Sequence, residues 1–97
     1  MSRRVLISHR AEADLREIWH YTAETWDESQ ADRYLDALAD GMQICGLRPQ
    51  DGTNRDAIRR GYWSARLRKH VIFYTVDETS VIIQRVLHGS QDHPQHL

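Results

Sequence analysis

Residues 70–88 read HVIFYTVDETSVIIQRVLH and form the most regular part of the sequence. Two runs rich in β-branched and aromatic residues, 70–76 and 81–88, flank the turn-forming residues DETS. A third run of the same kind, 62–67, ends just before the first of these two runs. Strands joined by such short turns run antiparallel, because a parallel crossover needs about a dozen or more residues. The pattern therefore predicts an antiparallel meander over residues 58–88.

The last predicted strand indicates which face of this sheet needs a cover. Val81, Ile83 and Leu87 lie on its more apolar face, which Arg85 interrupts, while the other face is mixed. Since successive side chains point to opposite faces of a strand, only one face of the sheet clearly requires burial.

A strand and a first amphipathic helix are expected before the meander. The apolar run from Val5 to Ile7 predicts a strand within residues 1–8, and Ser8 is a favourable N-cap for the helix that follows. The helix is indicated by apolar residues at a spacing of three to four, namely Ala11, Leu15, Ile18 and Trp19.

A second, longer helix follows after a tight connection. The capping-box pattern from Thr25 to Glu28 opens it, with Asp27 as an alternative cap, and Gly46 and Pro49 are stop signals. Its apolar stripe comprises Ala31, Tyr34, Leu35, Leu38, Met42 and Cys45.

Together these elements predict one α+β domain over residues 1–97, in which a helical hairpin, 9–47, packs on the antiparallel sheet in the order β-α-α-β-β-β. Residues 89–97 are expected to form a polar, solvated tail. Among the tryptophans we expect Trp19 in the core, Trp26 closing the hairpin and Trp63 as an exposed anchor.

Composition excludes several classes of protein. The longest apolar run has only a few residues, whereas a membrane span needs about 20, so we expect no membrane partner. Cys45 has no second thiol for a disulfide or a thiolate zinc cluster, which indicates a reducing, cytoplasmic compartment. The net charge of −1 argues against general nucleic-acid binding, and we expect no sequence-specific contact with DNA.

The charges are unevenly distributed along the chain. Residues 11–40 contain nine acidic and two basic residues, whereas residues 55–70 contain six basic residues and one acidic residue. Twelve of the 13 basic residues are arginine, which favours bidentate contacts with carboxylates or phosphates. This division predicts recognition of a partner.

Catalytic chemistry has weaker support. His88, Asp92, His93 and His96 do not have the spacing of a known metal motif, and glycine-rich phosphate loops are absent from the sequence, so we expect no metal and no cofactor. A metal-free ribonuclease is an open alternative, since it needs only a general base, a general acid and cations. Its candidate residues are His70, His88, Arg66, Arg85 and Tyr74.

Five stretches carry a family resemblance along nearly the whole chain. By their order and spacing the chain resembles the ParE toxins of the RelE/ParE superfamily, the toxin halves of bacterial toxin–antitoxin pairs. The stretches are Ser8-x-x-Ala11-x-x-Asp14-Leu15-x-x-Ile18-Trp19, Trp26-x-x-x-Gln30-Ala31-x-x-Tyr34, Ile58-Arg59-x-Gly61-Tyr62, His70-Val71-Ile72-Phe73-Tyr74 and Arg85-Val86-Leu87-His88-x-x-x-Asp92.

The resemblance implies a plasmid-stabilisation toxin that inhibits DNA gyrase by trapping it on cleaved DNA, and that is not itself an enzyme. It also implies a ParD-type antitoxin that lays a helix and an extended segment across the toxin. Since such antitoxins tend to be acidic, we expect antitoxin contacts at Arg59, Arg60, Tyr62, Trp63, Arg66 and Arg85. For the surface that faces gyrase we expect Arg68, Lys69, His88 and Asp92.

Two other functions stay open at this point. One is ribosome-dependent mRNA cleavage resembling that of RelE, and the other is an inert relative that only binds an antitoxin. The ending Leu-His-x-x-x-Asp and the single lysine favour the ParE branch. Gyrase and topoisomerase IV are equally compatible with the sequence.

Overall fold

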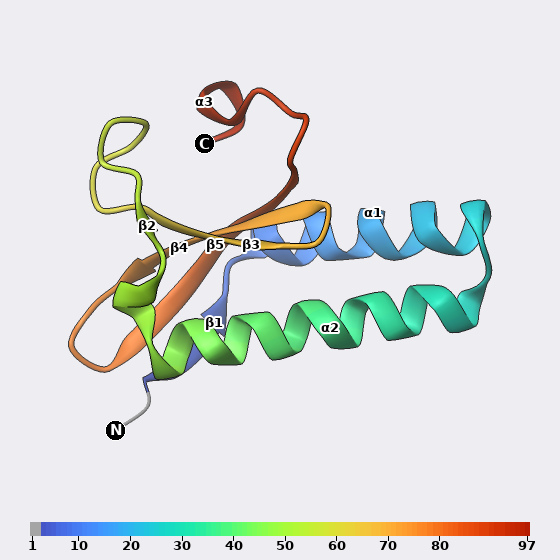
Figure 1. The fold of residues 1–97 in the computed structure, drawn as a ribbon, viewed down its shortest axis with the longest axis horizontal. Helices are drawn as coiled ribbons and strands as arrows, with labels where there is room; N and C mark the ends of the chain where they lie inside the picture. Colours follow the sequence, from blue (N-terminus) through green and yellow to red (C-terminus); the bar gives the residue numbers. More distant parts are fainter. Residues whose placement is uncertain (1–2) are drawn as a thin grey trace.

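A computed structural model describes residues 3–97. Three antiparallel strands and one parallel strand form a sheet with a short extra strand at its edge, and a helical hairpin lies against it (Figure 1). The elements are β1 (Arg4–Ile7), α1 (His9–Thr25), α2 (Glu28–Leu47), the 3-10 turn η1 (Pro49–Asp51), β2 (Thr53–Asn54), β3 (Trp63–Leu67), β4 (His70–Val76), β5 (Ser80–His88) and α3 (His93–His96).

The predicted β-α-α-β-β-β order and antiparallel meander are confirmed. The strand order is β1-β5-β4-β3-β2, and the pairs β2–β3, β3–β4 and β4–β5 are antiparallel. β1 pairs in parallel with β5, with Arg4 opposite Ser80. The segment that follows α2 contains η1 and β2, and β2 adds two residues to the edge of β3.

Local capping fixes where the two helices begin. The Ser8 hydroxyl accepts a hydrogen bond of 3.1 Å from the Ala11 N–H, as predicted. At α2 the structure uses Asp27 as the cap, and its carboxylate accepts a bond of 2.7 Å from the Gln30 N–H. Of the two alternatives, Thr25 instead ends α1.

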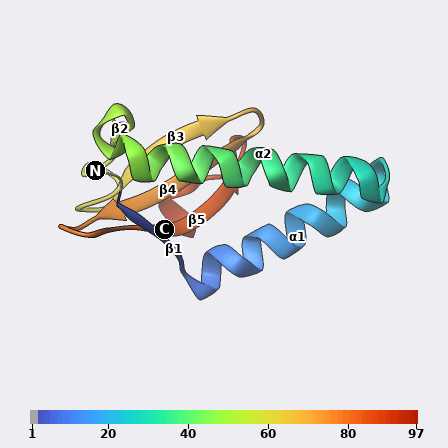
Figure 2. The same cartoon turned by 90° about the horizontal axis from the view of Figure 1, so that it is seen from below.

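The hairpin covers one face of the sheet, and its far end extends past the strands (Figures 1 and 2). The core between the two layers contains most of the predicted stripe of α2. The buried members of this core are Ala11, Tyr34, Leu38, Met42, Cys45, Ile72, Tyr74, Val81, Ile83 and Val86.

The second face of the sheet is also covered, contrary to expectation. Val71, Phe73 and Leu87 form a second buried cluster there with Tyr62, and Leu97 packs against it. Residues 89–97 are therefore only in part the solvated tail that was expected: five of them are exposed, but α3 lies on the side of the sheet opposite α2 and Leu97 packs there (Figure 1). The composition of the tail concealed this role because Leu97 is its one large apolar residue.

The tryptophans differ from the expectation in burial. Trp19 is only partly buried, and its indole N–H donates to Asp32 at 2.9 Å across the hairpin. Trp26 does not close the hairpin but is 73% exposed, because the turn at the end of α1 directs it outward. Trp63 is partly buried and packs against the main core rather than standing free.

Within residues 3–97, none of the helices combines the length and apolar character that a membrane span requires.

Two glycines of α2 provide a test of the packing between helix and strand. A Cβ at Gly46 would lie 2.8 Å from Val5 Cγ2 and 2.9 Å from the Arg3 carbonyl oxygen, whereas one at Gly41 would meet Ile72 Cδ1 at 3.4 Å. Alanine is about 1 kcal/mol more favourable than glycine inside a helix. We expect Gly41→Ala to keep or raise the free energy of unfolding in urea and Gly46→Ala to lower it by about 1–3 kcal/mol. Equal effects would contradict this packing.

Candidate functional site

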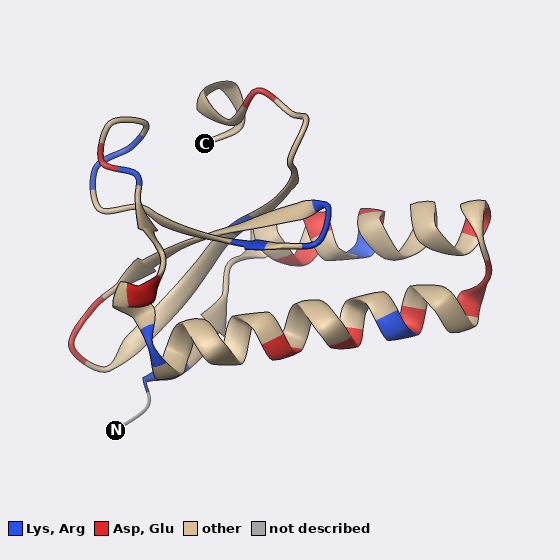
Figure 3. Cartoon of the chain, viewed as in Figure 1, with Lys and Arg blue, Asp and Glu red and all other residues tan. Residues whose placement is uncertain are grey.

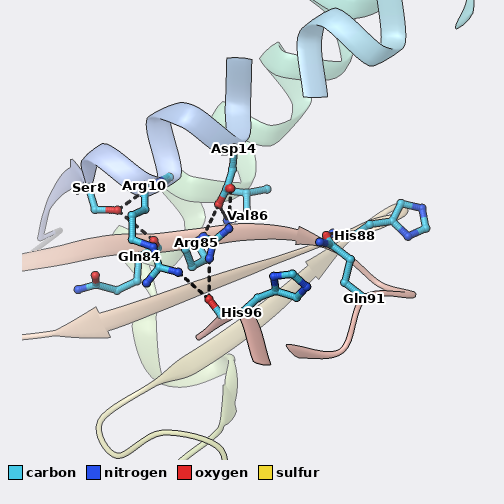
Figure 4. A network of polar contacts seen from close by, with 10 residues as sticks. Ser8, Arg10, Asp14, Gln84, Arg85, Val86, His88, Gln91 and His96 are labelled. Atoms are coloured by element: carbon cyan, nitrogen blue, oxygen red, sulfur yellow. Dashed lines mark hydrogen bonds and ion pairs between the residues drawn. The ribbon is translucent and has the colours of Figure 1, made fainter. Parts of the chain in front are cut away.

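A buried ion pair connects α1 to the centre of β5. The register of β4 and β5 shifts between Phe73 and Tyr74, which leaves Gln84 as an extra residue in β5. Just after this bulge, Arg85 donates from Nε and Nη2 to the two oxygens of Asp14, at 2.7 and 2.8 Å (Figure 4). The Val86 N–H donates to the same carboxylate at 3.0 Å. Both charged side chains are only 12% exposed, so this bidentate pair is largely desolvated.

The same arginine holds the end of the chain. Arg85 Nη1 donates to the His96 carbonyl oxygen at 2.5 Å, and Arg10 of α1 donates to that oxygen at 2.9 Å (Figure 4). At the start of α1, the Ser8 hydroxyl donates to the carbonyl oxygen of the bulge residue Gln84 at 3.0 Å. One polar network thus joins α1, β5 and α3.

A groove opens beside this network, between the hairpin and the turn that joins β3 to β4. It has a volume of about 700 Å³. α1 contributes Glu17 and Tyr21 to its wall, the turn at the end of α1 contributes Trp26, and the strand ends contribute basic side chains and histidines. Other lining residues include Asp14, Tyr34, Arg68, Lys69, His70, Arg85, His88 and His96.

A histidine pair lies at the base of the groove. His70 Nδ1 and the Tyr34 hydroxyl share a hydrogen bond of 2.6 Å, and the rings of His70 and His88 meet edge to face at 5.4 Å. Burial, and secondarily the nearby charge of His88, lowers the pKa of His70 to about 4. Burial likewise raises the pKa of Tyr34. At neutral pH the His70 imidazole and the Tyr34 hydroxyl are therefore both uncharged.

The residues expected to face gyrase are mostly brought together. Arg68, Lys69 and His88 all line the groove, and the Arg68 guanidinium lies 5.8 Å from the centre of the Tyr34 ring. Asp92 lies apart from them at the start of α3, where it is exposed.

The residues expected to bind an antitoxin are more dispersed. Arg60 is exposed, and Arg59 stacks over the Tyr62 ring at 5.3 Å and donates to the Leu97 main-chain oxygen. Arg66 lines a second groove of about 400 Å³ between α2 and β3. The members with buried or packed side chains are Tyr62, Trp63 and Arg85.

Three residues were not expected from the sequence to lie in this region, namely Tyr21, Trp26 and Asp14. Tyr21 and Trp26 are 71% and 73% exposed on the wall of the groove, and no periodicity distinguishes an exposed aromatic residue from a buried one. The position of Asp14 could have been noticed in the sequence. It is an acidic residue three positions after Ala11, on the apolar stripe of its helix, where a charged side chain needs a partner.

The burial of His70 predicts a pH dependence of stability. Between pH 6.5, the ordinary pKa, and about 4, the unfolded chain binds a proton that folded His70 does not, so stability falls as the pH is lowered through this window. We expect His70→Gln to lose less free energy of unfolding than the wild type between pH 7.5 and 5.0. His20→Gln, at an exposed position, is the control and should follow the wild type. Equal pH profiles for all three proteins would contradict the burial of His70.

Comparison with known proteins identifies the family. A sequence model described as the ParE toxin of the type II toxin–antitoxin system parDE matches residues 5–93. Toxin ParE1 of Mycobacterium tuberculosis is 37% identical over 98 residues and is covered, like this chain, over 100% of its length. Toxin ParE1 of Caulobacter vibrioides is 36% identical over 91 residues, which are 94% of each chain.

Solved structures share the fold. A chain of the chromosomal ParDE TA system from P. aeruginosa superposes with a TM-score of 0.79 at 15% identity, over 90% of this chain and 96% of that chain. A chain of the toxin–antitoxin complex RelBE2 from Mycobacterium tuberculosis superposes with a TM-score of 0.67 at 22% identity, over 91% of this chain and 99% of that chain. With the match over residues 5–93, these likenesses lead to one conclusion: the chain belongs to the ParE family of type II toxin–antitoxin toxins.

Proposed function

We propose that this toxin acts in the bacterial cytoplasm by inhibiting DNA gyrase, which it traps on cleaved DNA, and that a ParD-type antitoxin neutralises it. The observation that carries the proposal is the match to the ParE toxin family over residues 5–93. The solved relatives come from a ParDE system and a toxin–antitoxin complex, which supports an antitoxin as the partner. Stabilisation of a plasmid is a role consistent with such a pair.

The placement of polar groups supports an inhibitor over a ribonuclease. Of the residues a ribonuclease site would use, His70 and His88 line the groove, but Arg66 and Tyr74 do not. The Tyr74 hydroxyl is buried and donates to the Pro49 carbonyl oxygen at 2.7 Å. Arg85 does line the groove, yet its charge is paired with Asp14. The candidate acids, bases and cations are thus either separated or already engaged.

We assign the surface that faces the target to the groove and α3, with Arg68, Lys69, His88 and Asp92 as its contacts. Arg68 and Lys69 are exposed at the β3–β4 turn, and Figure 3 shows this turn as a basic tip. Their exposure leaves both cations free to meet an acidic surface or a phosphate.

We assign the antitoxin's acidic segment to an arginine patch formed by the exposed residues Arg59, Arg60 and Arg66. The other proposed contacts are Tyr62, Trp63 and Arg85, whose side chains are packed or paired within the fold. The exposed guanidinium groups of Arg60 and Arg66 would bind its carboxylates. Tyr62 packs in the cluster on the α3 side of the sheet, whereas Trp63 packs against the main core on the hairpin side. An acidic partner suits the β2–β3 loop, where basic residues cluster (Figure 3).

The proposed target is tested by gyrase cleavage of a supercoiled plasmid. Purified toxin titrated into gyrase should cause linear DNA with covalently attached protein to accumulate, and added ParD-type antitoxin should reverse the effect. The double variant Arg68→Glu with Lys69→Glu should lose at least tenfold in potency, since both cations are removed from the target-facing surface. If folded wild-type toxin leaves gyrase unaffected, the gyrase assignment is wrong, and mRNA cleavage on ribosomes is the next assay.

The arginine patch is tested by charge reversal at its two freely exposed cations. Arg60→Glu with Arg66→Glu should weaken antitoxin binding by about 1.4 kcal/mol or more, a factor of ten in Kd, in isothermal titration calorimetry. Arg16→Glu, an exposed reversal on α1, serves as the control and should change Kd much less. Trp63→Ala would not isolate binding from folding, because Trp63 packs against the main core. An unchanged Kd for the double variant would move the acidic segment elsewhere.

A further inference from the structure

We propose that the base of the larger groove, beside the β3–β4 turn, binds a phosphate group. The side chains that would hold it are all hydrogen-bond donors, namely Arg68, Lys69, His70, His88 and Gln91. The inference goes beyond the proposed function, because it concerns the toxin alone and holds whether or not gyrase is the target. It adds the chemical group that these side chains recognise.

The hydrogen bonds of His88 determine which of its ring nitrogens carries a proton. The Ser90 N–H donates to His88 Nδ1 at 3.1 Å, and the Ser90 hydroxyl oxygen lies 2.7 Å from the same nitrogen. Because Nδ1 accepts, the proton of the neutral imidazole is on Nε2, and the charged imidazolium would carry one there as well. Within residues 3–97 no hydrogen bond uses this Nε2. His88 therefore offers the groove a free N–H donor.

His70 offers a donor of the same kind. Its Nδ1 shares a hydrogen bond of 2.6 Å with the Tyr34 hydroxyl. Burial lowers the pKa of His70 to about 4, so its ring holds one proton at neutral pH. A phenol is a much stronger acid than a neutral imidazole N–H, so the hydroxyl donates to Nδ1 and the ring proton is on Nε2. Since the rings of His70 and His88 meet at 5.4 Å, their two donors belong to neighbouring rings.

Two further contacts bring the other donors to these histidines. The His88 N–H donates to Gln91 Oε1 at 2.7 Å, which fixes the orientation of the amide and leaves its NH2 group as a donor (Figure 4). The Gly89 N–H donates to the Lys69 carbonyl oxygen at 2.8 Å and ties the β3–β4 turn to the end of β5. Donors from two separate segments of the chain thus lie next to one another.

Arg68 occupies an unusual backbone position in this turn. Leu67 pairs with His70, so Arg68 and Lys69 alone make the connection between the two strands. In the described part of the chain, Arg68 is the one residue other than glycine with a positive φ, at 53°. Glycine, asparagine and aspartate are the usual residues at such a position. Because turn geometry does not favour arginine here, we attribute its presence to the cation that it adds to the groove.

A phosphate suits this set of donors better than a carboxylate does. The donors come from the β3–β4 turn on one side and from the end of β5 on the other. A carboxylate has two oxygens in one plane, which match a single planar fork of donors. A phosphate group has several acceptor oxygens in a tetrahedral arrangement and can accept hydrogen bonds from both segments at once.

The facing wall of the groove restricts the ligand to a small one. Glu17 is exposed on α1, and residues 11–40 contain nine acidic and two basic residues (Figure 3). Asp14 also lines the groove, but its charge is paired with Arg85. A long polyanion that crossed the hairpin would be repelled, whereas one phosphate at the turn stays on the basic side. The site is therefore compatible with a net charge of −1.

The site is tested by titrating inorganic phosphate into the purified toxin at pH 7.5 and constant ionic strength, with NMR of the imidazole signals as the readout. We expect saturable shifts of His70 and His88, and none with acetate. His20, which is exposed on α1 outside the groove, is the internal control and should not shift. Phosphate without saturation, or equal saturation by acetate, would overturn the site.

Two variants each remove one donor with little disturbance of the fold. Arg68→Gly removes the guanidinium and suits the positive φ, so its melting temperature should equal or exceed that of the wild type while the Kd for phosphate rises roughly tenfold. His88→Asn removes Nε2, while its Oδ1 can still accept from the Ser90 N–H, and should raise Kd by a similar factor.

A matched control separates a site from general charge attraction. Arg60→Gly removes the same charge at an exposed position outside the groove and should leave the Kd for phosphate within about twofold. Equal losses in Arg60→Gly and Arg68→Gly would contradict a defined site.

Two additional probes distinguish the sources of the phosphate group. Thymidine monophosphate that binds more tightly than inorganic phosphate would assign the site to a free nucleotide. A short oligothymidylate that binds more tightly than either would assign it to the backbone of a nucleic-acid strand. Every arm uses the toxin alone, so a negative gyrase assay leaves the site in place, and failure to bind phosphate leaves the gyrase proposal in place.

Discussion

The pairing of Asp14 with Arg85 is the constraint on which the rest of the structure depends. Removing two charges from water costs several kcal/mol for each ion, and only good geometry with additional hydrogen bonds offsets that cost. Here the carboxylate accepts two bonds from the guanidinium and one from the Val86 N–H, and the bulge at Gln84 aims Arg85 toward α1. The pair therefore sets the position of α1 against β5, and the same guanidinium hydrogen-bonds the His96 carbonyl oxygen of α3.

Periodicity was sufficient to predict the helices, the meander and their order, because each has an amphipathic pattern that only one layer arrangement satisfies. It could not assign a partner to β1, since an apolar run has no signal for which strand it joins or in which direction. The role of the tail was missed for a similar reason: three arginines and one apolar contact at Leu97 hold it, and none of these is periodic. Asp14 on a buried stripe and Arg85 on an apolar strand were each visible as exceptions. Their pairing becomes evident only when the two exceptions are considered together.

The candidate site shows the same division between types of residue and their placement. Basic residues and histidines could be selected from the sequence, and Arg68, Lys69 and His88 do gather on one groove. The exposure of Trp26 could not be predicted from the sequence, because an aromatic residue at the end of a helix is equally compatible with a core and with a surface. Nor could the engagement of Arg85, which depends on a register shift within the sheet. Charge pattern thus indicated the region, while packing decided which charges are available to a partner.

The parallel pairing of β1 with β5 has a consequence for the timing of toxin maturation. Arg4 lies opposite Ser80 and Ile7 opposite Ile83, so the first strand to leave the ribosome waits for the last. At roughly 5–20 residues per second, the intervening chain takes about 4 to 15 seconds to synthesise. Such non-local pairing also slows folding, because the entropy of closing the long loop is lost before the contacts form. During this interval the hairpin exists without its sheet, which gives an antitoxin already present in the cell time to meet the nascent toxin before its surface is complete.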